Sequence, residues 1–143
     1  MSLLLSVFAG LSGALLAVLW NGLVSARWLR RLATAPAAPA PHGEDGARSV
    51  LARIAGYALG GAGLGLLYWL SWGLVALVDV PWPVAGLAFG ALAWSATVAP
   101  ALATLALGPT RLPPRPLLVH AVEWLVACLG AGLFAAQAWA RLA

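Results

Sequence analysis

Two side chains in an otherwise apolar stretch have the chemistry to exchange a proton or to hold a ligand. His120 and Glu123 lie three residues apart in the segment LLVHAVEWLVACLGAGLF, residues 117–134. Residues at this spacing share one face of a helix, so the imidazole and the carboxylate can point the same way. If the segment crosses a bilayer, a charge there costs about 3 kcal/mol on insertion scales, which makes such residues functional candidates. The alternative is that both side chains only hydrogen-bond neighbouring helices together.

The composition indicates a membrane protein. Of the 143 residues, 63% are hydrophobic and 8% are charged, whereas about 25% of the residues of a soluble domain are charged. The abundance of Leu, Ala and Gly favours a bacterial source. The eight basic residues are all Arg and form no basic stripe, which argues against a nucleic-acid partner. Cys128 is the single cysteine, so disulfides within one chain are excluded.

Four stretches are long enough to cross a bilayer, which takes roughly 20 apolar residues. They are residues 3–25, 54–78, 84–107 and 117–139. We expect the first to be a retained helix rather than a signal peptide, because it lacks a positive region before its apolar run. Residues 32–49 form a Pro/Ala-rich linker that we expect to be extended and solvated. The sequence therefore predicts one all-α domain over residues 1–143, a polytopic membrane protein with four transmembrane helices in an antiparallel bundle.

The distribution of arginine predicts the orientation. Loops with many Arg residues stay in the cytoplasm. Seven of the eight Arg lie in or beside two loops that share one side of a four-span chain, namely Arg27, Arg30, Arg31, Arg48, Arg53, Arg111 and Arg115. The other side carries Asp79 and, near the C-terminus, Arg141. We expect a multi-pass protein of the bacterial inner membrane, with linker 32–49 in the cytoplasm and both termini in the periplasm.

Polar residues of the four spans fall at a similar depth. A helix rises 1.5 Å per residue, which puts Glu123 roughly 9 Å inside the hydrocarbon. The same distance along the other spans reaches Asn21, Tyr57 and the segment from Pro100 to Thr104. We expect Glu123 to face the bundle, because a carboxyl turned to lipid would have no partner. The candidate site for a proton or a ligand is therefore Glu123, His120, Asn21, Tyr57 and Thr104.

Glycines spaced four residues apart predict close contacts between helices, since small residues let membrane helices approach each other. The second span carries Gly56, Gly60, Gly61 and Gly65, and the third carries Gly86 and Gly90. The density of glycines in the second span predicts that it lies centrally in the bundle. The alternative is that these glycines line a permeation path.

Two stretches carry a resemblance to a known family. They are GLAFGALAWSATVAPALATLALGP, with Phe89, Gly90, Trp94 and Pro100, and HAVEWLVACLGAGLF, which opens on His120. Together with the PTRLPPRP loop between them, they resemble the YagU-like inner-membrane proteins of bacteria. LGGAGLGLLYWL in the second span is similar in style, so the resemblance covers the last three spans, and it implies a small four-helix architecture. It implies no function, because that family has no settled biochemistry, and Glu123 has no counterpart in its pattern.

These features favour a protein that is not an enzyme: an integral inner-membrane bundle with a structural or accessory role. No catalytic set and no metal-spaced cluster occurs, and with one histidine in the spans we expect no cofactor. The alternative is a small proton-coupled transporter or channel that uses Glu123 and His120. The expected partners are the lipid bilayer and either a second copy in a homodimer or another membrane protein, with no nucleic acid.

Overall fold

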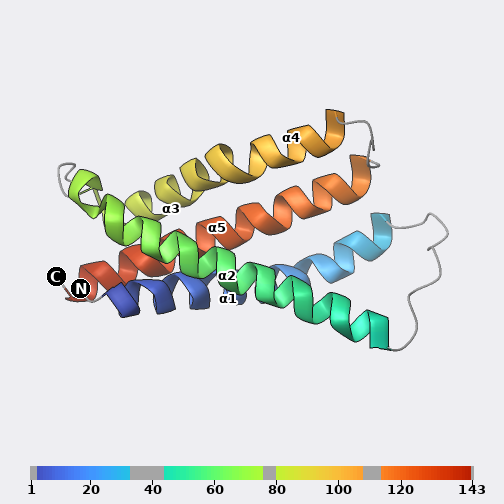
Figure 1. The fold of residues 1–143 in the computed structure, drawn as a ribbon, viewed down its shortest axis with the longest axis horizontal. Coiled ribbons are helices and arrows are strands. Elements are labelled where there is room, and N and C mark those ends of the chain that lie inside the picture. The colour runs from blue at the N-terminus through green and yellow to red at the C-terminus, as the bar shows by residue number, and fades with distance from the viewer. Residues whose placement is uncertain (1–2, 33–43, 76–79, 108–113, 143) are drawn as a thin grey trace.

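A computed structural model describes residues 3–32, 44–75, 80–107 and 114–142, and all of them except Val80 and Pro81 are helical. The helices are α1 (Leu3–Leu32), α2 (Glu44–Val75), α3 (Trp82–Ala93), α4 (Ala99–Leu107) and α5 (Pro114–Leu142), with a π-helical turn η1 (Trp94–Val98) between α3 and α4. Figure 1 shows α3, η1 and α4 as one continuous rod. The predicted all-α class is confirmed.

Four helical segments are long and apolar enough to cross a membrane. They are Leu3–Leu23, Ile54–Ser71, Trp82–Leu105 and Leu117–Arg141. Each falls within or close to one of the predicted spans, because long apolar runs fix both the helix and its length.

The linker expected over residues 32–49 is shorter in the structure. Helix α1 continues to Leu32 and helix α2 begins at Glu44, so the last part of the predicted linker is helical. Residues 33–43, with the Pro-rich part of the linker, lie outside the described residues.

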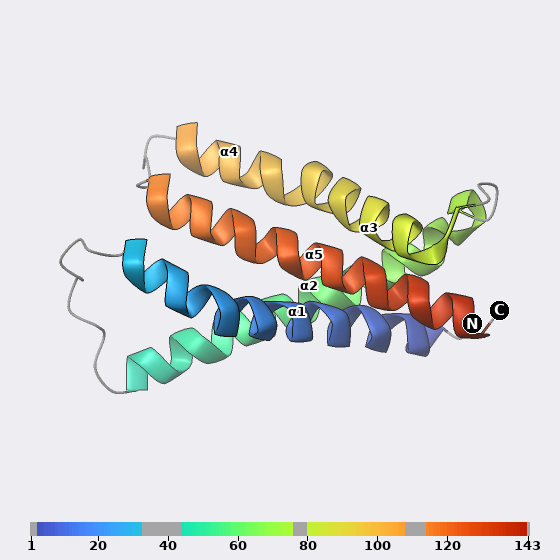
Figure 2. The ribbon, with the colours of Figure 1, turned by 180° about the vertical axis from the view of Figure 1, so that it is seen from behind.

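The central helix is α5 rather than the second span. Helix α5 contacts α1, α2, α3, η1 and α4, whereas α1 packs only against α2 and α5 within the described chain. Figures 1 and 2 show α1 and α3–α4 on opposite sides of α5. The reason is that α5 carries small residues on more than one side. Ala127, Ala131 and Ala135 are buried, and Gly130 and Gly132 face different neighbours.

Helices α1 and α2 touch through backbone. A Cβ atom on Gly61 would come within 2.6 Å of the Ala14 Cβ, and one on Gly65 would collide with the carbonyl of Ser6. The buried Ser6 hydroxyl donates a hydrogen bond of 2.7 Å to the carbonyl oxygen of Gly65. Glycine is therefore required where these two helices meet.

Helix α5 also packs closely against its neighbours through glycines, on two of its sides. A Cβ on Gly130 would lie 2.5 Å from the carbonyl oxygen of Gly13 in α1. On the other side, a Cβ on Gly86 would lie 2.8 Å from the carbonyl oxygen of Gly132, and one on Gly90 would lie 2.6 Å from that of Cys128. These approaches are too close for any larger residue without a shift of the helices.

The other two glycines of the predicted packing set behave differently. A Cβ on Gly56 would meet nothing within 4 Å, so the structure does not place Gly56 at a helix contact. Figures 1 and 2 show the reason: α2 diverges from α1 toward the end where α2 begins. Gly60 faces a side chain instead of a backbone, because its Cβ would come within 2.7 Å of the Trp124 ring.

The third span contains a π-helical turn just before Pro100. The backbone N–H of Ala99 bonds the carbonyl of Trp94, five residues back. A proline inside a helix lacks a donor and crowds the preceding turn, and an insertion of this kind relieves the conflict. The hydroxyls of Ser95 and Thr97 donate to the carbonyls of Ala91 and Ala93, at 2.8 and 2.6 Å.

Candidate functional site

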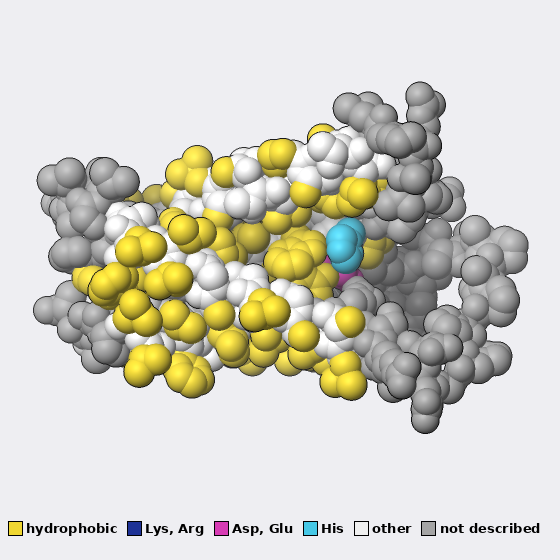
Figure 3. Space-filling model, in the orientation of Figure 1, with side chains coloured by type: hydrophobic (Ala, Val, Ile, Leu, Met, Phe, Trp, Pro, Cys, Tyr) yellow, Lys and Arg dark blue, Asp and Glu magenta, His cyan; other side chains and the backbone are white. Residues whose placement is uncertain are grey.

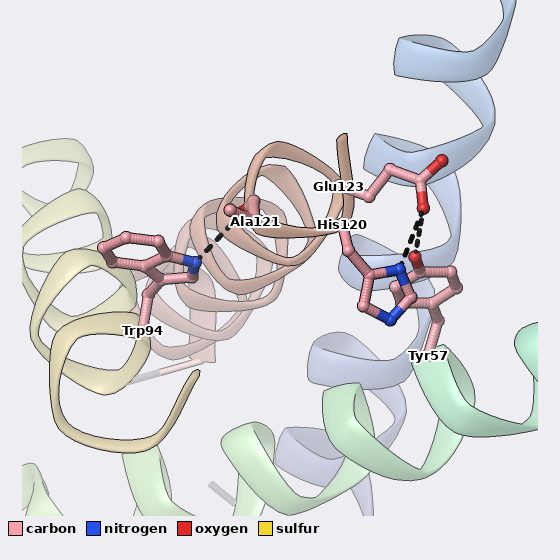
Figure 4. Close-up of polar contacts among 5 residues, drawn as sticks. All are labelled: Tyr57, Trp94, His120, Ala121 and Glu123. Atoms are coloured by element: carbon pink, nitrogen blue, oxygen red, sulfur yellow. Dashed lines mark hydrogen bonds and ion pairs between the residues drawn. The ribbon is translucent and has the colours of Figure 1, made fainter. Parts of the chain in front are cut away.

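The Glu123 carboxylate is paired with Tyr57 across two helices. The Tyr57 hydroxyl of α2 donates a hydrogen bond of 2.7 Å to Glu123 Oε2 of α5, and the Tyr57 ring is buried. Figure 4 shows the two side chains pointing at each other between the helices. The expectation that Glu123 faces the bundle and meets a polar partner there is confirmed for Tyr57.

His120 stands one turn before Glu123 on the same helix. Its Nδ1 lies 3.8 Å from Glu123 Oε2, and the side chains are 49% and 17% exposed, respectively. In Figure 4 the His120 ring and the Tyr57 hydroxyl both approach the same carboxylate oxygen, Glu123 Oε2. The arrangement is a partly buried acceptor next to a more open imidazole. It can hold helices together or pass a proton between the two groups.

Trp124 completes the contact between α2 and α5. Its ring centroid lies 4.8 Å from that of Tyr57, at an interplanar angle of 51°. The same indole occupies the space left by the missing side chain of Gly60. Gly60 is therefore explained by the size of Trp124, since any Cβ at residue 60 would overlap the ring. The sequence reasoning missed Trp124, although its place beside Glu123 is the signal that could have found it.

A second tryptophan ties the π-helical turn to α5. The Trp94 indole N–H donates a hydrogen bond of 3.1 Å to the carbonyl oxygen of Ala121. Figure 4 shows this contact on the side of α5 away from Tyr57. The residues from His120 to Trp124 thus connect α5 to α2 on one side and to the third span on the other.

One predicted member of the site, Thr104, lies apart from the others. The Thr104 hydroxyl is exposed and donates to the carbonyl of Ala101 in its own helix, at 2.7 Å. Within the described residues α2 does not pack against α4, so Thr104 is not brought to Tyr57. Asn21 is half-buried on α1 and takes part in a polar interaction. The depth count thus identified Tyr57, His120 and Glu123 as neighbours and misplaced Thr104.

The described residues contain no group of three or more His, Cys, Asp or Glu side chains able to hold a metal ion. Cys128, buried in the core beside Ala127, has no second thiol in the chain to pair with. Comparisons of this chain with models of protein families, with curated proteins and with solved structures found no match. The chemistry of the site therefore rests on Tyr57, His120, Glu123 and the tryptophan beside them.

Proposed function

We propose that the chain is a multi-pass protein of the bacterial inner membrane, without enzymatic activity, whose four helices form an antiparallel bundle with a structural or accessory role. The observation that carries the structural role is the hydrogen bond from Tyr57 to Glu123. This carboxylate lies inside the fourth span and is engaged in joining two helices. The resemblance to the YagU-like proteins stays a prediction that fits this architecture.

The surface of the helices supports the membrane placement. Large apolar side chains point outward along the spans, with Leu4 68%, Leu59 75% and Leu92 70% exposed. Continuous apolar surface of this extent is unusual on a monomer in water, and lipid chains would cover it. Figure 1 shows α1, α2, α3–α4 and α5 running from one end of the molecule to the other, which suits four crossings. The arginine distribution then favours periplasmic termini.

The position of the Tyr57–Glu123 contact supports a structural role. It joins α2 to α5 one residue after Gly56, where an added Cβ would meet nothing within 4 Å. A buried carboxylate without a partner is costly, whereas one that accepts a hydrogen bond stabilises the pair of helices. The contact therefore holds this part of α2 against α5.

Substitutions at Glu123 test this role through the stability of the purified chain in detergent. We expect Glu123→Gln to be nearly silent, because the amide still accepts the Tyr57 hydrogen bond. Glu123→Ala should lower stability by about 1–3 kcal/mol, since it removes the acceptor and leaves a buried hydroxyl without its partner. Val122→Ala, at an exposed neighbouring position, is the control and should have a small effect. Equal stability of Glu123→Ala and the control would contradict the structural role.

A second candidate function is a small proton-coupled transporter or channel that uses Glu123 and His120. The observation that favours it is the half-exposed imidazole 3.8 Å from the less exposed carboxylate, an arrangement that suits proton entry from the N-terminal end of α5. In that case Glu123→Gln keeps the fold and abolishes pH-dependent flux of the substrate in vesicles. A variant that keeps full flux would exclude Glu123 as the proton carrier.

A further inference from the structure

The third span is held very unevenly along its length. Its first half, α3, lies against α5 through the buried Gly86 and Gly90, where added Cβ atoms would come within 2.8 Å and 2.6 Å of carbonyl oxygens of α5. Its second half, α4, contacts α5 only slightly, and among the described residues it contacts neither α1 nor α2. None of residues 99–105 is buried, and Leu105 is 43% exposed. The two halves therefore differ in how firmly they are attached to the bundle.

The π-helical turn between the two halves is a weak point of the helix. Its last bond runs from the N–H of Ala99 to the carbonyl of Trp94, five residues back, and Pro100 follows with no N–H to donate. The hydroxyls of Ser95 and Thr97 bond carbonyls of the preceding turn, a pattern that often bends helices. Prolines and π-helical turns are the usual places where helices kink. Three causes of bending thus coincide within residues 94–100.

The start of this turn is fixed to α5. The Trp94 indole N–H donates a hydrogen bond of 3.1 Å to the carbonyl oxygen of Ala121. Trp94 and Val98 also pack against the buried core around Ala127. No described residue of the third span after Val98 takes part in that core. The attached part of the span therefore ends at Val98, where the weak turn ends.

We propose that η1 is a hinge, about which α4 swings away from α5 while α3 stays in place. Leu105 lies about 10 Å beyond Val98 at 1.5 Å per residue, so a kink of about 20° moves it by about 4 Å. The inference goes beyond the structural role of the Tyr57–Glu123 contact. It is a conformational change of one helix and does not depend on how the chain is oriented in a membrane.

The swing affects the end of the bundle that carries the candidate site. Figures 1 and 2 show α4 beside the first part of α5, the part that contains His120 and Glu123. Figure 3 shows the histidine side chain on the surface toward this end of the molecule. Movement of α4 widens this end, whereas the end where α3 packs on α5 keeps its width. The hinge therefore changes the surroundings of the site without disturbing the glycine contacts.

Distances between pairs of nitroxide labels test the hinge on the purified full chain in lipid nanodiscs, by double electron–electron resonance. Cysteines replace Leu105 and Leu118 for α4 and α5, or Leu87 and Ala140 for α3 and α5, and alanine replaces Cys128. All four label positions are exposed. We expect the first pair to show a second population that is longer by about 4 Å or more, and the second pair to show one narrow population. Equally narrow distributions for the two pairs overturn the proposal.

Two proline variants identify the cause of the movement. Pro100→Ala restores a backbone donor, so it should reduce the longer population of the first pair by at least about twofold, as expected for one additional hydrogen bond. Pro83→Ala is the matched control, since proline fits the first turn of α3 and its replacement should change nothing. A longer population that persists in Pro100→Ala, or falls equally in Pro83→Ala, overturns the proposal. If either variant fails to fold, the comparison of the two label pairs decides alone.

Discussion

At the scale of single residues, the bond between Tyr57 and Glu123 explains why a carboxylate stands in an apolar helix. The hydroxyl donates to Oε2 at 2.7 Å from a buried ring. Tyr57→Phe removes this donor without creating a large cavity, and we expect a loss of about 1.5–3 kcal/mol, as for hydrogen bonds to charged groups. Thermal unfolding in detergent measures it.

Tyr68→Phe is the matched control for that substitution. Tyr68 lies on the same helix, is equally buried, and packs its ring edge-on against Phe89 at 5.0 Å between centroids. No hydrogen bond of its hydroxyl is found among the described residues, so the loss should be smaller. A larger loss for Tyr68→Phe than for Tyr57→Phe would mean that the bond to Glu123 contributes little.

The candidate site could be predicted from the sequence only as far as depth along a helix determines it. Counting residues inward from each end placed Tyr57 level with Glu123, and the structure joins them. Thr104 falls at a similar depth but bonds its own helix, because depth does not specify which way a side chain points or which helices are neighbours. Trp124 was missed because its place beside Glu123 is the one signal that marks it, and an indole in an apolar run has no polar spacing of its own.

At the scale of helices, glycines at specific positions determine how closely neighbouring helices approach each other. Gly65→Ala should lower stability by about 1–3 kcal/mol, because the added Cβ collides with the Ser6 backbone and forces α1 and α2 apart. Gly63→Ala, on the same helix, is the matched control, since a Cβ there meets nothing within 4 Å. It should be neutral or stabilising by up to about 1 kcal/mol, because alanine favours helix. Comparable losses for the two variants would contradict the packing of α1 on α2.

The helices themselves were largely predictable, but their irregularities and neighbours were not. A long apolar run requires a backbone whose hydrogen bonds are all internal, so composition alone predicts each span. The π-helical turn before Pro100 depends on how the helix accommodates a proline that has no backbone N–H, and several local geometries can do this. The central place of α5 depends on which small residues face each other across helices. Glycine density favoured the second span, although a Cβ on Gly56 would meet nothing within 4 Å.

At the scale of the whole molecule, the proposed arrangement is a chain that crosses the membrane four times with its arginine-rich loops in the cytoplasm. All eight basic residues are arginine, and seven of them lie on one side of the predicted bundle. In the reverse orientation these arginines would lie on the periplasmic side, whereas arginine-rich loops normally stay in the cytoplasm. Glu123 and His120 would then lie near the opposite leaflet, because both are close to the end of α5 that follows the second arginine loop.

Labelling of single cysteines in intact cells tests this arrangement most directly. The native Cys128 is buried and is replaced by alanine. A cysteine introduced at Ala38, in linker 32–49, should resist a membrane-impermeant maleimide until the cells are opened, whereas one in a short tag after Ala143 should react at once. Reaction at residue 38 and protection after residue 143 in intact cells would contradict the account, as would equal reaction at both sites in spheroplasts with sealed membranes.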